Sequence, residues 1–506
     1  MTRSNKTTIA VIVCALALVL SSLFYFQNHS EKESQAELSS QETVDYRGPV
    51  DDCLQFELLY SRDGILAADC TANYVHYYPK NYDPKVAEKT KGDLRIGSFN
   101  LFHLGDNQAP MKSLSLVAKI INQWDVVGAQ EMMPLPGEWA VANQKIYDFL
   151  VANRANVVFP HQNWKVTFPG YLALLHELHE IDPSWALILQ PSPEGEGTSG
   201  EMAGFFYRSS RVRLKDWGYC PRDGAVELKS NESLFNYGCL TQIPPDQRQL
   251  MSRVAFTAFF QAGNFDFIGV TTHVRFRPSD QEADRKAQEV SICNSHENLQ
   301  KCKVANEFVG RFYEVQAIAR QIHDMKQIAG DQDVVFMGDF NIEFAKNNQA
   351  LWNASLKDAP GYVVTQTAPT TLSIKSAKMA SNYDHFILDP QATKECDINT
   401  VRDFNFTDVE NSTDPVKKDI ARMLSPAMQA VLLSDASAEL EMLTKFQLGK
   451  NKGLRPLSDK EKADMTKSYA DSVTRMKANK YGALLELISD HIPVEMNCRI
   501  GTRDDD

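Results

Sequence analysis

Acidic, amide and imidazole side chains stand at the ends of several short apolar segments that lie far apart in the chain. In the clearest of them, residues 334–341, an apolar run leads into Gly338, Asp339 and Asn341. Apolar runs of this length are typical of buried strands. A carboxylate at such a strand end can position and deprotonate water, and an amide can donate a hydrogen bond to a phosphoryl oxygen. The same pattern is also typical of a turn that simply ends a strand.

Five further segments repeat this combination of an apolar run with polar side chains at one end. The polar residues are Asn100, Gln130 with Glu131, His273, Asp384, and Asp490 with His491. A carboxylate beside a histidine raises the pKa of the imidazole and makes it a better proton donor. The carboxylate of Glu131 suits magnesium, which prefers one or two carboxylates together with water and substrate phosphate. One such segment is common in any protein, whereas six of them favour a metal-assisted hydrolytic site.

The elements that must position these side chains alternate between helix and strand. Residues 114–124 carry apolar side chains at helical spacing and precede the apolar run that begins at Val126. Residues 311–329 repeat this pattern before the run that begins at Val334. Such alternation predicts an α/β or α+β fold from Leu94 onward.

In their order along the chain, the motifs resemble those of the endonuclease/exonuclease/phosphatase superfamily, and they look closest to those of deoxyribonuclease I-like enzymes. The resemblance covers residues 94–498. The combination of Gly338-Asp-Phe-Asn341 with Ser489-Asp-His-Ile-Pro493 is quite specific to the superfamily, but much less specific for a substrate. The remaining matches are Ser98-Phe-Asn100, Gln130-Glu131, Glu201, Thr272-His273 and Tyr383-Asp384.

The resemblance implies a four-layer sandwich of the α/β (α+β) class, in which two packed mixed β-sheets are flanked by helices. It also implies a hydrolase that cleaves phosphodiesters with a divalent metal, in the first place magnesium, with manganese or calcium as alternatives. By the same comparison, Glu131 binds the metal, with Asn100 and Asp490 nearby.

The resemblance further assigns roles around the reacting phosphate. Asp339 helps to orient or deprotonate the attacking water, and Asn341 holds the phosphate. Two pairs then face the scissile phosphate from two sides, His491 with Asp384 and His273 with Glu201.

Weaker matches concern groups that would contact the substrate. Arg253 stands where some relatives have a residue that contacts a phosphate, although Ser252-Arg253-Val254 is only a loose match. Either Thr370 or Thr371 stands where relatives keep a hydroxyl. Arg275 and Arg277, just past His273, suggest a small local basic site.

The composition is that of a large globular protein. The chain has 506 residues, of which 43% are hydrophobic and 23% charged, and this excludes wholesale disorder. The formal net charge of -12 disfavours a protein that coats nucleic acid non-specifically, because such binding rests on phosphate neutralisation by Lys and Arg. It leaves open a nuclease whose basic groups are local and whose metal supplies positive charge.

The N-terminus carries a targeting signal. Residues 8–26 contain no charged side chain and are long enough to cross a bilayer, and Arg3 and Lys6 precede them. We expect residues 1–26 to form either a retained membrane anchor or a cleaved signal peptide. Both alternatives place the catalytic domain outside the cytoplasm, as a membrane-anchored or a secreted protein.

The rest of the chain divides into a polar tether at 27–46, a Cys-containing lead-in at 47–90 and a catalytic domain at 91–500. Residues 132–200 and 400–487 look inserted, and the second stretch is predicted to be helical. Its Met-rich stripe is typical of a buried core, and a lid, membrane-contacting or partner-binding role is the alternative.

The cysteines fit an oxidising compartment. Without Cys14, eight remain, and eight cysteines allow 105 pairings. Proximity in the sequence favours pairing Cys53 with Cys70, Cys220 with Cys239 and Cys293 with Cys302, which leaves Cys396 with Cys498. Free buried thiols are the alternative.

The first functional hypothesis is an extracytoplasmic, metal-dependent endonuclease, a monomer that acts on nucleic acid. The second is a lipid phosphodiesterase of the sphingomyelinase type, which the membrane anchor and the Met-rich insertion favour. An inositol-lipid phosphatase is the third. A catalytically inactive, anchored interaction protein comes from a different class, and its signature would be the loss of metal-binding or water-handling residues. None of these residues is missing.

Overall fold

We describe the protein from a computed structural model. The described residues are 66–105, 109–134, 169–195, 200–221, 235–365, 368–410, 412–445 and 458–501. The predicted anchor, the tether and the first part of the lead-in lie outside these residues. In the described part of the chain, no helix is both long and apolar enough to cross a membrane.

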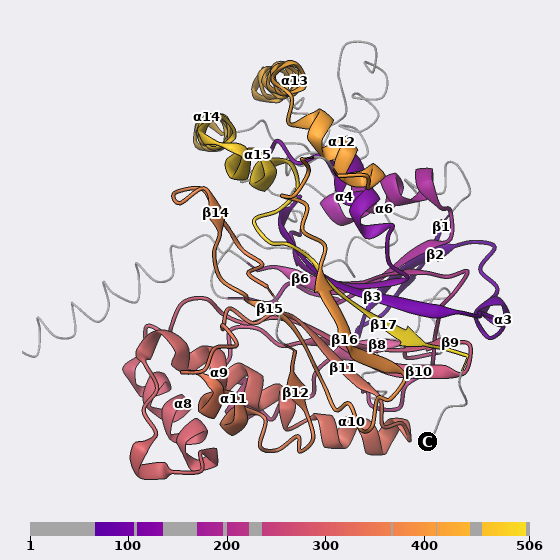
Figure 1. Cartoon of the computed structure of the whole chain (residues 1–506), viewed down its shortest axis with the longest axis vertical. Helices are drawn as coiled ribbons and strands as arrows, with labels where there is room; N and C mark the ends of the chain where they lie inside the picture. The colour runs from indigo at the N-terminus through magenta and orange to yellow at the C-terminus, as the bar shows by residue number, and fades with distance from the viewer. Residues whose placement is uncertain are drawn as a thin grey trace, which may run out of the picture. The chain divides into compact units, whose positions relative to one another are not determined.

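Two large mixed sheets form the centre of the described structure (Figure 1). The first has eight strands in the order β1 (Leu66–Cys70), β2 (Val75–Pro79), β5 (Trp185–Leu189), β6 (Met202–Arg208), β4 (Val126–Met132), β3 (Asp93–Leu104), β17 (Val494–Arg499) and β16 (Cys396–Asp403). The second has seven strands, with the path β12 (Val363–Val364), β15 (Asp384–Leu388), β11 (Val334–Asp339), β10 (Phe265–His273), β9 (Phe256–Ala262) and β7 (Arg213–Leu214), while β8 (Gly238–Leu240) pairs with β9. A separate hairpin joins β13 (Leu372–Ser373) to β14 (Lys378–Met379).

The helices cover the outer faces of the two sheets (Figure 1). On the first sheet lie α4 (Leu114–Ile121) and α6 (Gly170–Ile181), together with α12 (Pro415–Met423), α13 (Pro426–Lys445), α14 (Asp459–Ala478) and α15 (Lys480–Leu487). On the second lie α8 (Glu282–Ser295), α9 (Asn306–Ala319), α10 (Ile322–Ala329) and α11 (Gln349–Ser355). The short helices are α3 (Pro84–Ala87), α7 (Pro245–Arg248) and η2 (Leu299–Lys301).

Side-chain alternation along the strands explains the layers. Successive residues of a strand point to opposite faces, so in β3 the side chain of Ile96 enters the core between the sheets while Phe99 packs under the helices. In β11, Val335 lies between the sheets and Phe336 packs under the helices of the second sheet. The four-layer sandwich predicted from the sequence is therefore confirmed.

The lead-in at 47–90 and the stretch 132–200, which the sequence presents as additions, both contribute strands to the first sheet. β1 and β2 extend the first sheet, so the described part of the lead-in is built into that sheet. The interpretation of residues 132–200 as an insertion is wrong for α6 and β5, because β5 pairs with both β2 and β6. The Pro- and Gly-rich composition near residue 190 masked this buried strand.

The described residues between 400 and 487 are largely helical as predicted, apart from the end of β16 and the stretch that leads into α12. The Met-rich stripe is core at Met465 and Met476, which are only 1% and 2% exposed, whereas Met423 is partly buried and Val431 is 49% exposed. Ile420 and Leu432 are buried in the same cluster. The stripe is therefore core on α14, and on α12 and α13 it is core only in part.

Three predicted disulfides are present. They join Cys220 to Cys239, Cys293 to Cys302 and Cys396 to Cys498. Cys396 and Cys498 face each other across β16 and β17. The pairing of Cys70 with Cys53 remains a prediction, because Cys53 lies outside the described residues. Three disulfides fit a secreted or extracytoplasmic domain.

Gly338 permits the close approach of β11 to β10 just before Asp339. Its φ of 150° lies in a region that residues with a side chain rarely adopt, and a Cβ placed there would lie 2.0 Å from the carbonyl oxygen of Thr272. Because this oxygen belongs to the neighbouring parallel strand, it cannot move without disturbing the pairing of His273 with Asp339.

We therefore expect Gly338→Ala to lower the free energy of unfolding by about 3 kcal/mol or more, since backbone strain and a backbone clash act together. The measurement is the urea midpoint followed by circular dichroism. Gly501→Ala is the matched control, because a Cβ at Gly501 meets open space. Equal midpoints for the two variants would contradict this account of Gly338.

Candidate active site

The predicted site residues meet at one end of the two sheets. β3 pairs with β4 in parallel and β10 with β11 in parallel, so the carboxyl ends of each pair lie side by side. The register places Asn100 opposite Gln130 and His273 opposite Asp339. Asp384 pairs with Asp339 from the antiparallel strand β15. Asp490 and His491 come from the segment between α15 and β17.

Asn100 joins the first sheet to the second through its side chain. Its Nδ2 donates to Glu131 Oε1 at 2.9 Å and to Asp339 Oδ2 at 3.0 Å. The backbone N–H of His103 donates to the other oxygen of Glu131 at 3.1 Å. The predicted gathering of Glu131 and Asp339 is therefore observed, with a neutral amide between the two carboxylates.

Glu131 is ionised in this environment. Burial alone would raise its pKa, but His273, His103 and the hydrogen bond from Asn100 outweigh burial and lower the pKa to about 2. The negative charge is thus present at neutral pH and available to a cation.

Several backbone segments at the site adopt the left-handed conformation. The φ angle is 56° at Glu131 and 53° at Asn341, and Phe102 and His103 have φ values of 42° and 50°. Such conformations are uncommon for residues other than glycine and concentrate at functional sites. Two of them, Glu131 and Asn341, are the residues predicted to bind the metal and the phosphate.

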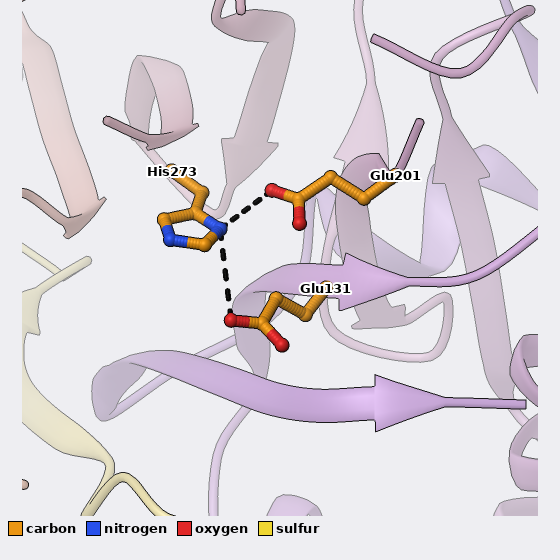
Figure 2. Close-up of side chains that lie close together, drawn as sticks. All are labelled: Glu131, Glu201 and His273. Atoms are coloured by element: carbon orange, nitrogen blue, oxygen red, sulfur yellow. Dashed lines mark hydrogen bonds and ion pairs between the residues drawn. The ribbon is translucent and has the colours of Figure 1, made fainter. Parts of the chain in front are cut away.

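The first predicted pair, His273 with Glu201, is present (Figure 2). His273 Nδ1 lies 2.5 Å from Glu201 Oε1 and 3.7 Å from Glu131 Oε1. Arg253 Nε lies 2.9 Å from the same oxygen of Glu201. Arg253 therefore reaches the site by holding Glu201, although its contact with a substrate phosphate remains a prediction.

The imidazole of His273 is cationic because of these neighbours. Burial alone would lower its pKa, but the charges of Glu201 and Asp339 raise it to about 9 against the opposing effect of Arg253. His273 is protonated at neutral pH, with Glu201 fixing the orientation of the ring.

The second predicted pair, His491 with Asp384, is also present. His491 Nδ1 lies 2.8 Å from Asp384 Oδ2, and Asp384 is fully buried. Burial acts to lower the pKa of His491, but Asp384, Asp339 and Asp490 raise it well above the usual value.

Asp339 lies between the two imidazoles. Its Oδ2 is 3.5 Å from His273 Nε2 and 3.4 Å from His491 Nε2, and its side chain is only 2% exposed. Burial raises the pKa of Asp339, an effect that the two imidazoles oppose. A carboxylate with a raised pKa accepts a proton more readily than an exposed aspartate does.

Asn341 is held beside Asp339 with its amide directed at the same place. Its backbone N–H donates to Asp339 Oδ1 at 2.8 Å, and its Nδ2 donates to the carbonyl oxygen of Val274 at 2.9 Å. The same Nδ2 lies 3.1 Å from His273 Nε2. Asn341 is thus close to the ring that would face the phosphate.

Asp490 completes the group and keeps contact with solvent. Its side chain is 29% exposed, and its Oδ1 is 4.0 Å from His491 Nε2. Burial raises its pKa to about 6, with Glu131 and Asp339 adding repulsion and His491 opposing it. A cation would relieve this repulsion.

Two sets of side chains could hold a metal. One consists of Glu131, Glu201 and His273, whose ligand atoms lie within 4.8 Å of one another (Figure 2). The other is the predicted set of Glu131, Asp490 and Asn100. A histidine ligand must be deprotonated, and His273 is cationic and committed to Glu201. The carboxylate and amide oxygens of the second set fit a hard cation such as magnesium.

Some residues of the site carry no signal in the sequence. His103 contacts Glu131 through its backbone, which any residue could do. Lys112 is buried and donates to the carbonyl oxygen of Ile488 at 2.7 Å, next to the segment that carries Asp490. Glu314 accepts from the backbone of Ser252 and Arg275, and so fixes the segments that follow Met251 and His273.

The structure also separates residues that the sequence left equivalent. Both threonine hydroxyls donate to the carbonyl oxygen of Ser381. The hydroxyl of Thr370, which is buried, also accepts from the backbone N–H groups of Tyr383 and Asp384, whereas that of Thr371 accepts from the backbone N–H of Ser381. Arg275 is buried and donates to the carbonyl oxygen of Arg277, so the predicted basic site is wrong for Arg275. Arg277 is exposed.

The fold and the site together define a four-layer protein with a carboxylate- and imidazole-lined site at the carboxyl ends of its central strands. No family model and no curated protein matches the chain. Solved structures do match. An endonuclease/exonuclease/phosphatase from Bacteroides vulgatus is 14% identical, with a TM-score of 0.30 and coverage of 62% of this chain and 90% of that one.

Two further solved structures are similar to this chain. D. rerio TDP2 complexed with single-strand DNA product is 15% identical, with a TM-score of 0.29 and coverage of 62% of this chain and 88% of that one. The human Nocturnin catalytic domain with bound sulfate is 9% identical, with a TM-score of 0.31 and coverage of 62% of this chain and 84% of that one.

The raised pKa of Asp490 leads to a pH dependence of metal binding. Below about pH 6 the carboxyl group is protonated and cannot bind a cation, so we expect the affinity for Mg²⁺ or Mn²⁺ to fall roughly tenfold between pH 7 and pH 5. Isothermal titration calorimetry at the two pH values measures this affinity. Asp490→Asn should remove most of this dependence, and Asp408→Asn, at an exposed position, should keep it. An unchanged profile in Asp490→Asn would count against Asp490 as a ligand.

Proposed function

We propose that the protein is a divalent-metal-dependent phosphodiester hydrolase that cleaves nucleic acid, an endonuclease of the deoxyribonuclease I type. The observation that carries this proposal is the position of Asp339. Its carboxylate lies between two imidazoles, each of which is paired with its own carboxylate, and it is bridged by Asn100 to Glu131. This arrangement combines a base, two cationic proton donors and a metal-binding carboxylate within one site.

The residues suggest a distribution of tasks in hydrolysis. Asp339 accepts a proton from water, and the water oxygen forms a bond to phosphorus as the bond to the leaving oxygen breaks. Imidazolium groups of His273 and His491 neutralise charge on the phosphate, and one of them donates a proton to the leaving oxygen. Asn341 holds a phosphoryl oxygen. Glu131 and Asp490 would hold the metal, proposed to be magnesium, which when bound would supply Lewis-acid stabilisation of charge on the phosphate.

The choice of nucleic acid over lipid rests on the character of the helical insertion. Met465 and Met476 are buried in the core, and Met423 packs partly buried against it, so these three methionines do not form an open apolar face for an acyl chain. Arg277 is exposed a few residues past His273 and can contact a flanking phosphate. An inactive interaction protein would not need the pairs of His273 with Glu201 and of His491 with Asp384, so their presence disfavours that alternative.

The disulfides support a location outside the cytoplasm. The predicted anchor at residues 8–26 would hold the enzyme at a membrane if it is retained, and release the enzyme if it is cleaved. A monomer is the expected state.

The first test is activity itself. We expect the purified protein to nick plasmid DNA with Mg²⁺, to stop when EDTA is added and to recover with excess Mg²⁺, as followed by gel electrophoresis. Cleavage of sphingomyelin in the absence of DNA or RNA cleavage would establish the lipid alternative. Inertness toward every phosphoester would favour the interaction protein.

The second test concerns the central base and one imidazole. Asp339→Asn and His491→Ala should each lower kcat by about 10³-fold or more, since both groups are proposed to act at the reacting phosphate. Steady-state cleavage of a labelled oligonucleotide measures this change. His323→Ala serves as a control, because His323 is exposed on α10. Near-normal rates in both site variants would refute the roles assigned to these residues.

A third test uses the raised pKa of His273. Its imidazolium exists below about pH 9 and is lost above it, so kcat/KM should fall as the pH rises through about 9. Glu201→Gln removes the largest charge that raises this pKa, and it should move the basic limb to lower pH. A pH–rate profile with an unmoved basic limb in Glu201→Gln would show that another group titrates there.

A further inference from the structure

A cavity of about 490 Å³ separates α14 from the segment that follows Asn100. Its volume lies in the range of sites that bind small ligands. The lining residues are Phe102 and His103 on one side and Asp464, Lys467, Ser468, Asp471 and Arg475 on the other. The cavity thus has one wall from the helical insertion and one from the sheet that carries the candidate active site.

The second wall is continuous with the metal-binding end of that site. The backbone N–H of Phe102 donates to Asn100 Oδ1 at 2.9 Å, and that of His103 donates to Glu131 Oε2 at 3.1 Å. A group bound in the cavity would therefore lie next to Glu131. Phe102 and His103 thus take part in both places, with their backbone N–H groups bonded to active-site side chains while they also line the cavity.

The wall formed by α14 is polar along its whole length. Its five lining residues recur at intervals of three or four and so share one face of the helix. An adjoining face, with Met465 and Met476, is buried in the core. α14 is thus anchored by one face and presents the other to the cavity.

The charged groups on this wall differ in how firmly they are held. Arg475 is paired with Glu486, a fully buried carboxylate, and is fixed in place. Lys467 Nζ lies 2.6 Å from Asp471 Oδ2, but these side chains are 76% and 48% exposed. An exposed pair of this kind contributes little to stability, so both members can turn to a ligand at small cost.

The chemistry of the lining selects the kind of ligand. Arg475 is neutralised by Glu486, and the remaining charges are the two carboxylates of Asp464 and Asp471 and the ammonium of Lys467. This balance disfavours a polyanionic headgroup, and the polar wall disfavours an acyl chain. A nucleobase fits better, because its edge carries both donors and acceptors and its face stacks on an aromatic ring. Phe102 supplies such a ring, and Asp464, Asp471, Lys467 and Ser468 supply both kinds of hydrogen-bonding partner.

We propose that this cavity binds the base of a nucleotide next to the scissile phosphate, and that α14 thereby sets the base preference of the enzyme. The proposal rests on the proposed cleavage of nucleic acid. It assigns the helical insertion a direct part in substrate selection.

The experiment compares cleavage products from a pool of random-sequence, single-stranded oligonucleotides by sequencing, with the full chain and Mg²⁺. We expect wild type to prefer one base at a fixed position beside the cut by roughly fivefold or more, the order that one base contact contributes. Asp464→Asn and Asp471→Asn should change or remove the preference at that position alone. Lys477→Ala is the matched control, since Lys477 is exposed on α14 but does not line the cavity.

A second readout is the ratio of kcat/KM for an oligonucleotide to that for bis(p-nitrophenyl) phosphate. This ratio should fall severalfold in the two aspartate variants and stay constant in Lys477→Ala. Nucleic-acid cleavage with the same base preference in all variants would overturn the base site alone. Hydrolysis of bis(p-nitrophenyl) phosphate without any cleavage of nucleic acid would overturn the nucleotide substrate and the base site together.

Discussion

Mutual repulsion among carboxylates is the constraint on which the rest of the site depends. Glu131, Glu201, Asp339 and Asp384 are largely or wholly buried within one small region, and Asp490 borders it. Charges removed from water are tolerated only when they are paired. The two imidazolium groups, the guanidinium of Arg253 and the amide of Asn100 supply that pairing in part. Burial is the main cause of the raised pKa of Asp490, and Glu131 and Asp339 add a repulsion that a cation would relieve.

The sheets make this concentration of charge possible because each group is held by a different strand end. Parallel pairing within both sheets aligns the strand ends, and Gly338 lets the two central strands of the second sheet approach closely. The left-handed backbone at Glu131 and Asn341 turns these side chains toward the common centre at a cost in conformational energy. Packing in three hydrophobic clusters provides the stability that offsets this strain.

Much of the fold and most of the site could be predicted from the sequence, because the apolar runs and their polar ends repeat a pattern with a direct physical meaning. The pairs of His273 with Glu201 and of His491 with Asp384 are present as predicted. Contacts made by the backbone of His103 escape such reasoning, since they do not depend on residue type. Arg275 was misjudged because the sequence shows a charge but not its burial. The strand β5 was hidden by the turn residues that follow it.

The bond between Cys396 and Cys498 has a consequence for how this protein can diversify. It closes a segment of 102 residues that contains α12 to α15, and it does so between two neighbouring strands of the first sheet. The ends of the segment stay fixed whatever lies between them, and lengthening a closed loop costs little additional entropy. Because Asp490 and His491 also lie in this segment, its helices can be extended only where these two residues and the buried faces of the helices keep their places.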